Sequence, residues 1–289
     1  MHKILIGLLT LTLPFIWTGE GADSFLGGLP LYYWQQKEFV NFGDYLSVKI
    51  VERILEAPVV IYKKPKVPKQ KLLALGSLLY FANTGDVLWG TGSNNKYPNK
   101  EDYNFTDLDI RAVRGPLTRA FIQENFGVEC PEVYGDPGLL FPFLFPEFKR
   151  KEKPKHPYIF IPHMYERNWF SKEDGDHIVN PTQPWDVVIG KILDSEFVIS
   201  SSLHGLIIAE AYGIPARYLR LSDKEPLFKY QDYYYATGRP DFAFATSVEE
   251  AMRLGGEPPA QFEPERLYDA FPFEFWPNIH FQKPSFDRL

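Results

Sequence analysis

Short apolar runs alternate with helical patterns along most of this chain, and that alternation limits its possible folds more than any other feature. Runs such as residues 87–89 and 197–200 each lead into a glycine- or serine-bearing turn, after which apolar residues recur at helical spacing. Strands that alternate with helices form parallel sheets, with the helices packed on both faces. The sequence therefore predicts an α/β protein.

The alternation is interrupted twice by stretches rich in lysine and proline, residues 63–71 and 148–157. The first reads as a solvated loop and the second as a linker between two domains, residues 28–148 and residues 156–289, the latter with a tail. We expect strands at residues 31–34, 59–62, 72–75, 87–89, 109–113, 158–161, 197–200 and 216–219, and helices at residues 45–55, 78–82, 116–125, 185–193, 205–212 and 248–254.

The N-terminus carries an apolar run at residues 4–17 that follows His2 and Lys3 and precedes several small residues. The run is shorter than the ~20 residues of a membrane span but fits the core of a signal peptide. A first buried strand is the alternative, and Pro14 and Trp17 favour the signal. We expect residues 1–22 to be a signal-like or membrane-tethering segment that associates the protein with a membrane.

Charge and cysteine content argue against several classes of partner. The net charge is −6, and no basic stripe with interleaved aromatic residues is present, so a nucleic-acid partner is not expected. The single cysteine, Cys130, allows neither an intrachain disulfide nor a cysteine-based zinc site. The six histidines lack the spacing of metal-binding motifs, so we expect no protein metal site.

One histidine stands out by its place in the stretch FVISSSLHGLIIAEAYGIPARYLR. His204 follows three serines at the carboxyl end of an expected strand and directly precedes an expected helix. Ligands of open parallel sheets bind at that edge, and the start of a helix favours an anion. His204, Ser201 and Ser202 are therefore candidates for an anion site. A helix-capping serine beside a packed histidine is the alternative.

Similar turns recur where the other expected strands end. Any single glycine turn is weak evidence, because glycine also serves backbone geometry. Six such turns in order favour one shared site. Their residues are Asn41 and Asp44, Gly76 and Ser77, Thr91 and Gly92, Arg114, Gly135 and Asp136, and Ser201 and His204.

Six segments carry these turns: NFGDYLS, LALGSLL, WGTG, VRGPLTR, YGDPGLL and SSLHGLIIAEAYGIPA. In this order they resemble the polysaccharide pyruvyl transferase family, and FKYQDYYYATGR resembles a segment of exopolysaccharide ketal-pyruvate transferases. The similarity spans roughly residues 41–239. It implies an α/β fold of two Rossmann-like domains that face each other across a cleft, in a GT-B-like arrangement.

The resemblance also implies a reaction. A pyruvyl group would pass from phosphoenolpyruvate to sugar hydroxyls of a polysaccharide or glycan precursor, including lipid-linked sugars, and form a pyruvate ketal. Phosphoenolpyruvate would be a co-substrate, and no cofactor is expected. This donor is a cytosolic metabolite whereas the N-terminus looks secretory, so the two indications of localisation oppose each other.

The donor carries a phosphate and a carboxylate, so its site needs cations or N–H donors. Arg114 offers a planar guanidinium suited to either anion. In some relatives an arginine precedes the Leu-His pair, where this chain has Ser202, so other cations have to compensate. The expected donor-binding residues are Arg114, Ser201, Ser202, Gly76, Ser77, Gly92 and Arg220.

The enol ether has to be protonated at its methylene carbon, and an imidazolium suits that role. We expect His204 to be this acid, because a nearby anion would favour its protonated form. Asp44 or Asp136 is the candidate base, with a helix cap and a turn former as the respective alternatives. The expected acceptor-binding residues, which would contact a sugar or merely pack, are Lys229, Tyr234 and Arg239.

Two other functions remain open at this point. A nucleotide-sugar glycosyltransferase with the same architecture would need an acidic residue for the ribose, and Glu210 follows the SSLHG turn too closely for a clear assignment. A catalytically silent glycan-binding or assembly protein would keep the fold without the chemistry. Stabilisation by phosphoenolpyruvate, by nucleotide sugars or by neither distinguishes the three hypotheses.

Overall fold

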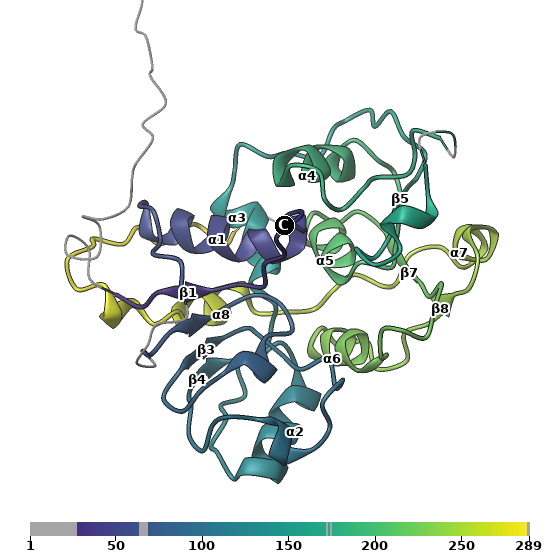
Figure 1. The fold of residues 1–289 in the computed structure, drawn as a ribbon. Coiled ribbons are helices and arrows are strands. Elements are labelled where there is room, and N and C mark those ends of the chain that lie inside the picture. Colours follow the sequence, from purple (N-terminus) through teal and green to yellow (C-terminus); the bar gives the residue numbers. More distant parts are fainter. Residues whose placement is uncertain (1–27, 64–68, 172, 174, 288–289) are drawn as a thin grey trace, which may run out of the picture.

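Two four-stranded sheets, both entirely parallel, form the framework of the molecule (Figure 1). The computed structural model describes residues 28–63, 69–171, 173 and 175–287, so the expected signal-like segment at residues 1–22 lies outside the described residues. The first sheet contains β1 (Leu31–Tyr32), β2 (Leu72–Leu73), β3 (Val87–Trp89) and β4 (Asp109–Ala112), and the second contains β5 (Ile159–Ile161), β6 (Val198–Ser200), β7 (Ala216–Leu219) and β8 (Phe244–Ala245). The predicted parallel α/β architecture is confirmed.

Both sheets gain a partner on the outer side of their first strand. Ile61 forms a parallel bridge with Leu31, and Ile178 forms one with Phe160. The strand expected at residues 59–62 is thus reduced to one bridge. With these bridges, each sheet reverses its order next to its first strand: between β1 and β2, and between β5 and β6. Such reversals are where open α/β sheets bind ligands.

The helices mostly follow the apolar pattern. They are α1 (Phe42–Leu55), α2 (Pro116–Phe126), α3 (Phe141–Leu144), α4 (Trp185–Leu193), α5 (Leu203–Ala211), α6 (Phe228–Ala236), α7 (Val248–Leu254) and α8 (Pro264–Asp269). α2 starts with Pro116 at its first position and ends at Gly127, whose φ of 68° suits a glycine. The helix expected at residues 78–82 is only a 3₁₀ turn, Leu79–Phe81. No described helix is long and apolar enough to cross a membrane.

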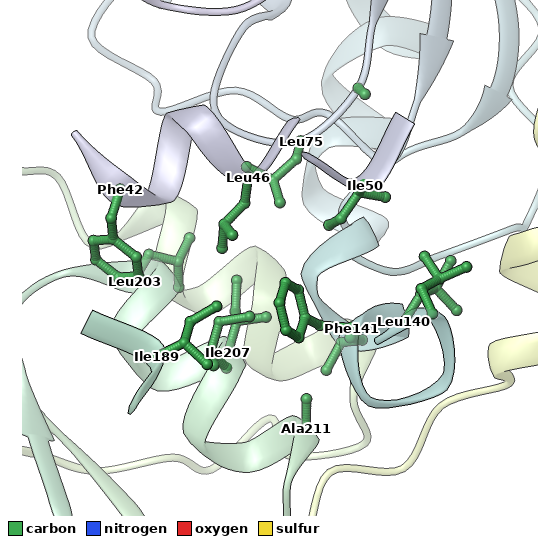
Figure 2. Close-up of a cluster of buried hydrophobic side chains, with 14 of the residues drawn as sticks. Phe42, Leu46, Ile50, Leu75, Leu140, Phe141, Ile189, Leu203, Ile207 and Ala211 are labelled. Atoms are coloured by element: carbon green, nitrogen blue, oxygen red, sulfur yellow. The ribbon is translucent and has the colours of Figure 1, made fainter. Parts of the chain in front are cut away.

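Helix α1 belongs by sequence to the first unit. It packs against α3 of the same unit and against α4 and α5, which follow the linker. Figure 2 shows buried apolar side chains of α1 facing those of α3, α4 and α5. One continuous cluster of buried apolar residues therefore includes parts of both units. Its labelled members are Phe42, Leu46, Ile50, Leu75, Leu140, Phe141, Ile189, Leu203, Ile207 and Ala211.

The C-terminal tail also crosses between the units. After α7 the chain returns to the first sheet, where α8 lies beside β3 (Figure 1). The indole N–H of Trp89 donates a 2.8 Å hydrogen bond to the Leu267 carbonyl, and its ring meets Phe271 edge-on at 5.0 Å. Trp276 lies so close to Gly28 that any side chain at residue 28 would collide with its indole. The tail therefore completes the core of the first unit.

Candidate active site

The two order reversals contribute to one pocket of about 200 Å³. From the first unit come Asn41 and Asp44, at the start of α1, and Gly76 and Ser77, directly after β2. From the second come side chains that follow β5 and β6. The pocket-lining residues of the second unit are His163, Met164, Tyr165, Ser202, Leu203, His204, Glu225 and Lys229.

His204 lies in this pocket, but as the second residue of α5 rather than in a loop before it. The helix begins earlier than the apolar pattern predicted, with Ser202 as its N-cap. The His204 side chain is largely enclosed, and a Cβ added to Gly43 would lie 2.7 Å from its Cγ. Only a glycine at residue 43 therefore leaves room for the imidazole in this position.

Asp136 lies behind His204, out of reach of solvent. Its Oδ2 is 3.7 Å from Nε2 of the imidazole, and neither atom has a hydrogen-bond partner among the described residues. Its Oδ1 accepts a 2.9 Å bond from the Gly138 N–H, which fixes the carboxylate at the start of a 3₁₀ helix, Pro137–Leu140. Asp136 is therefore both a turn former and the partner that faces His204.

Asp44 reaches the pocket from the first turn of α1. The alternative role as helix cap is wrong, because α1 starts at Phe42 and Asn41 is its N-cap. The Asn41 amide donates a 2.8 Å bond to Oδ2 of Asp44. Burial raises the pKa of the Asp44 carboxyl, and the nearby charge of His204 and this hydrogen bond offset only part of the effect.

Glu225, on the second unit, lies in a cluster of ionisable side chains to which both units contribute. Lys229 donates a 2.8 Å bond to this carboxylate, and Lys96 from the first unit contacts its other oxygen. Nε2 of His163 is 3.4 Å from the Lys229 ammonium. Lys96, Lys229, Glu225 and His163 all line the pocket, so two cations there face one fixed carboxylate besides Asp44.

The protonation states in this group follow from burial and from the neighbouring charges. Burial, and next the charge of Lys229, lower the pKa of His163 to about 3, so its ring is neutral at pH 7. Burial alone would raise the pKa of Glu225, but the charge of Lys229 and the hydrogen bonds from Lys229 and Lys96 outweigh it and lower the pKa to about 2. Burial also lowers the pKa of Lys229.

Arg114 does not line the pocket as the sequence suggested. Its fully buried guanidinium pairs with Asp232 at 3.1 Å and also donates to the Ser93 carbonyl. Its Nη1 donates a 2.7 Å bond to Oγ of Ser77, which does reach the pocket. Gly92 lies against the guanidinium, since a Cβ there would be 2.6 Å from Cζ. Arg114 and Gly92 therefore support Ser77 from behind.

The two serines before α5 differ in exposure to the pocket. Ser202 lines it as the N-cap of α5. Ser201 is buried behind it, where its hydroxyl bonds the Glu166 carboxylate and accepts a 2.8 Å bond from the His163 N–H. Ser201 thus joins the β6–α5 turn to the loop after β5 and supports the pocket wall.

Three other expected residues lie away from the pocket, which corrects the predictions that they bind donor or acceptor. Arg239 is buried and pairs with Glu210 at 2.8 Å. Tyr234 is fully buried and stacks on Phe242 with ring centroids 4.4 Å apart. Arg220 pairs with Asp223. The tyrosine segment forms α6, and this helix turns most of its rings into the core.

The sequence interpretation missed several pocket residues. His163 follows the expected strand at residues 158–161 much as His204 follows the strand at residues 197–200. The rule that ligands bind at the carboxyl ends of parallel strands would therefore have found it. Lys96, Tyr97, Tyr165 and Glu225 lie in irregular segments without such a signal. Within the described residues, no three His, Cys, Asp or Glu side chains come together as metal ligands.

Taken together, the two parallel sheets and the acid–base group at their shared pocket define an α/β enzyme of two Rossmann-like units. The family model of polysaccharide pyruvyl transferases matches residues 41–223, more than half of the chain. The chain belongs to this family, and it is a transferase of polysaccharide biosynthesis.

Two curated relatives extend over most of the chain. The succinoglycan biosynthesis protein ExoV of Rhizobium meliloti (strain 1021) is 30% identical over 238 residues, which cover 78% of this chain and 71% of the relative. The uncharacterized protein L143 of Acanthamoeba polyphaga mimivirus is 25% identical over 210 residues, covering 69% and 71%. A crystal structure of a functionally uncharacterized Klebsiella pneumoniae protein aligns with a TM-score of 0.45 and 13% identity, over 76% of this chain and 94% of that one.

Proposed function

We propose that the protein transfers the pyruvyl group of phosphoenolpyruvate to two hydroxyls of one sugar in a polysaccharide or its precursor, and that its two units adopt a GT-B-like arrangement around the reactants. The relative from Rhizobium meliloti acts in succinoglycan biosynthesis, so an exopolysaccharide of that kind is the first acceptor to test. The observation that carries the proposal is the pair of His204 and Asp136 at the wall of a pocket supplied with cations.

Donor binding relies on groups that favour anions. Within the described part of the chain, the backbone N–H groups of Leu203 and His204 have no hydrogen-bond partner, and they stand at the start of α5. A helix start binds phosphate or carboxylate through such groups. Ser77 has its oxygen lone pair engaged by Arg114, so its own O–H is available to the donor. Lys229 and Lys96 supply the charge.

The reaction requires two opposite proton movements. His204 gives a proton to the methylene carbon, which becomes the methyl group and leaves the central carbon electrophilic. Asp136 stabilises the imidazolium before this step. One sugar hydroxyl then attacks the central carbon and gives its proton to Asp44, whose raised pKa suits a base. Phosphate leaves with the proton that Asp44 took up, and the second hydroxyl closes the ketal as it gives its own proton back to His204.

The alternatives receive less support from the site. Glu210, the acidic residue after the SSLHG turn, is bound to Arg239 and Tyr233 and so cannot hold the ribose of a nucleotide sugar. A silent glycan-binding protein has no need for a buried carboxylate oxygen and a buried imidazole nitrogen that face each other without hydrogen-bond partners among the described residues, because unpaired buried polar atoms destabilise a fold.

The test combines donor binding with one substitution. Phosphoenolpyruvate should raise the melting temperature of the protein, whereas UDP- and GDP-sugars should not. His204→Gln should lower turnover by about 10²–10⁴-fold, the usual contribution of a general acid, with little change in melting temperature. Turnover is measured as phosphate release with succinoglycan freed of its ketals, and with galactosides, glucosides and mannosaminides as further acceptors.

The matched control is His280→Gln, which changes an exposed histidine outside the pocket and should keep full turnover. Near-normal turnover of the His204→Gln protein would show that another group is the acid. Stabilisation by a nucleotide sugar in place of phosphoenolpyruvate would identify a glycosyltransferase instead.

A further inference from the structure

Aromatic side chains supply a large part of the pocket lining, and two of them are unusually exposed. Tyr97 is 40% exposed and Tyr165 is 44% exposed, although rings of this size usually lie in the core. Tyr97 belongs to the loop after β3 and Tyr165 to the loop after β5, so each unit contributes one. The aromatic residues that line the pocket are Trp34, Tyr80, Phe81, Tyr97 and Tyr165.

The Tyr97 ring has a fixed orientation. It stacks on Tyr80 with centroids 3.7 Å apart and an angle of 14° between the planes. The Tyr103 hydroxyl holds the Tyr97 backbone through a 2.9 Å bond to its carbonyl. Because Tyr97 remains 40% exposed beside this stack, part of its ring is available to a ligand. A ring that is already ordered loses little entropy when it binds a ligand.

Lys96 brings the two exposed tyrosines to the same part of the pocket. It directly precedes Tyr97, it contacts Glu225, and its ammonium lies 5.5 Å from the centroid of the Tyr165 ring. The Tyr165 N–H points to Nδ1 of His163 at 3.4 Å, which ties this residue to the charged group. We call Tyr97 and Tyr165 together the aromatic platform.

The size of the cavity decides what the platform can hold. At about 200 Å³ it is smaller than the ~300–1,000 Å³ of sites that enclose drug-sized ligands. A small donor bound beside His204 takes up much of this space. The sugar to be modified, and still more any chain attached to it, then has to lie at the mouth, where the exposed rings are.

Resting on the function proposed above, we infer that the aromatic platform is the acceptor subsite and that the acceptor is a glycan chain rather than a single sugar. A pyranose has an apolar C–H face that packs on a flat ring, while its hydroxyls at the edge remain hydrated. The sugar next to the modified one stacks on the platform, and the modified sugar reaches inward toward His204 and Asp44.

Binding of the full chain to immobilised glycans, in the presence of phosphoenolpyruvate, tests this inference. The probes are oligosaccharides from bacterial polysaccharides, including acid-treated succinoglycan without its ketals, and the single-sugar glycosides. Tyr97→Ala and Tyr165→Ala should each weaken oligosaccharide binding by roughly 3- to 10-fold, the range expected for loss of one ring contact. Tyr97→Phe keeps the ring and should bind as the wild type does.

The matched control is Tyr235→Ala, which removes a 37% exposed tyrosine from α6 outside the pocket and should leave binding unchanged. Wild-type affinity in both platform alanine variants, or no binding of any glycan to the wild type, would overturn the inference. Single-sugar glycosides that bind as tightly as the oligosaccharides would overturn the acceptor class.

A separate melting experiment with phosphoenolpyruvate keeps this result apart from the proposed function. The platform variants should retain the stabilisation by phosphoenolpyruvate that the wild type shows, since the rings are not part of the proposed donor site. A wild-type protein that phosphoenolpyruvate does not stabilise, but that loses glycan binding in Tyr97→Ala, would contradict the reaction and support the platform.

Discussion

Two histidines line the pocket, and they differ in the charged groups that surround them. His204 faces the carboxylate of Asp136, whose Oδ2 lies 3.7 Å from its Nε2. His163 lies beside the ammonium of Lys229 and stays neutral well below pH 7. The neutral ring therefore adds no positive charge to that of Lys229 and Lys96. At the scale of single residues, the charged groups around each ring therefore distinguish the two histidines, although both follow the end of a strand.

The low pKa of His163 predicts a loss of stability in acid. The unfolded chain takes up a proton on this ring near pH 6.5, whereas the folded protein does not until about pH 3. The unfolded state therefore binds more protons between these values, and the free energy of unfolding falls as the pH falls through that window. Between pH 7 and pH 4.5 the residue should account for roughly 2 kcal/mol of the loss.

Urea unfolding of the wild type and of His163→Asn at the two pH values measures this effect. The variant should lose less stability than the wild type on acidification, because asparagine does not titrate. Other groups, such as Asp44 with its raised pKa, affect both proteins alike and cancel in the comparison. Equal losses in the two proteins would contradict a neutral His163 in the folded state.

Sequence reasoning at this scale singled out His204 and Asp44, which line the pocket, and Asp136, which lies behind His204. It was misled by Arg114 and Arg239, because the fate of a guanidinium depends on carboxylates distant in sequence. Asp232 lies 118 residues beyond Arg114, and nothing local to VRGPLTR announces it. The assigned reaction roles of these pocket residues remain predictions.

The approach of two helices shapes the pocket at the scale of secondary-structure elements. The first turn of α1 lies against the first turn of α5, with Gly43 under the imidazole of His204. The sequence predicted both helices but started α1 at residue 45 and α5 at residue 205, too late to show this contact. Apolar spacing marks the buried face of a helix, whereas these first turns begin after Asn41 and Ser202, N-cap residues whose side chains make no capping hydrogen bond.

Gly43→Ala tests that approach. The added methyl group collides with the ring of His204, which must turn away from Asp136. We expect turnover to fall at least tenfold while phosphoenolpyruvate still stabilises the protein, as measured by phosphate release and thermal melting. Gly190→Ala is the control, since residue 190 lies within α4 with open space around it; this change should stabilise the fold by about 0.5–1 kcal/mol.

Turnover of Gly43→Ala close to that of the wild type would show that His204 is free to reorient.

The shorter elements illustrate a second limit of the sequence pattern. The 3₁₀ turn at Leu79–Phe81 and the bridge at Ile61 looked like a helix and a strand, because a few apolar residues in a row fit either pattern. Only their neighbours in space decide how far such elements extend.

The whole molecule behaves as one unit because its two sheets share their core and their polar contacts. Arg114, which follows β4, forms a fully buried ion pair with Asp232 on α6. The hydroxyl and N–H of Thr118 on α2 bond the same carboxylate, at 2.7 and 2.9 Å. The sequence predicted the two sheets and the linker, but such contacts between the units have no local signal.

Arg114→Ala should therefore act on stability before it acts on binding. Removing one partner of a buried pair leaves the carboxylate of Asp232 uncompensated, which costs about 3–5 kcal/mol. Guanidinium unfolding should show this loss in a single transition that involves both units. Arg119→Ala, which removes a partly exposed arginine paired with Glu132, should cost about 1 kcal/mol or less. Unchanged stability of Arg114→Ala with lost donor binding would support the direct grip that the sequence suggested.

The returning tail has a further consequence for anyone who exchanges parts between relatives. In a hybrid of two relatives joined at the linker, α8 and the indole of Trp276 would come from one protein, whereas Trp89 and Gly28, which they contact, would come from the other. Such a hybrid therefore needs two junctions, one at the linker and one after α7, so that the C-terminal tail comes from the same protein as the first unit.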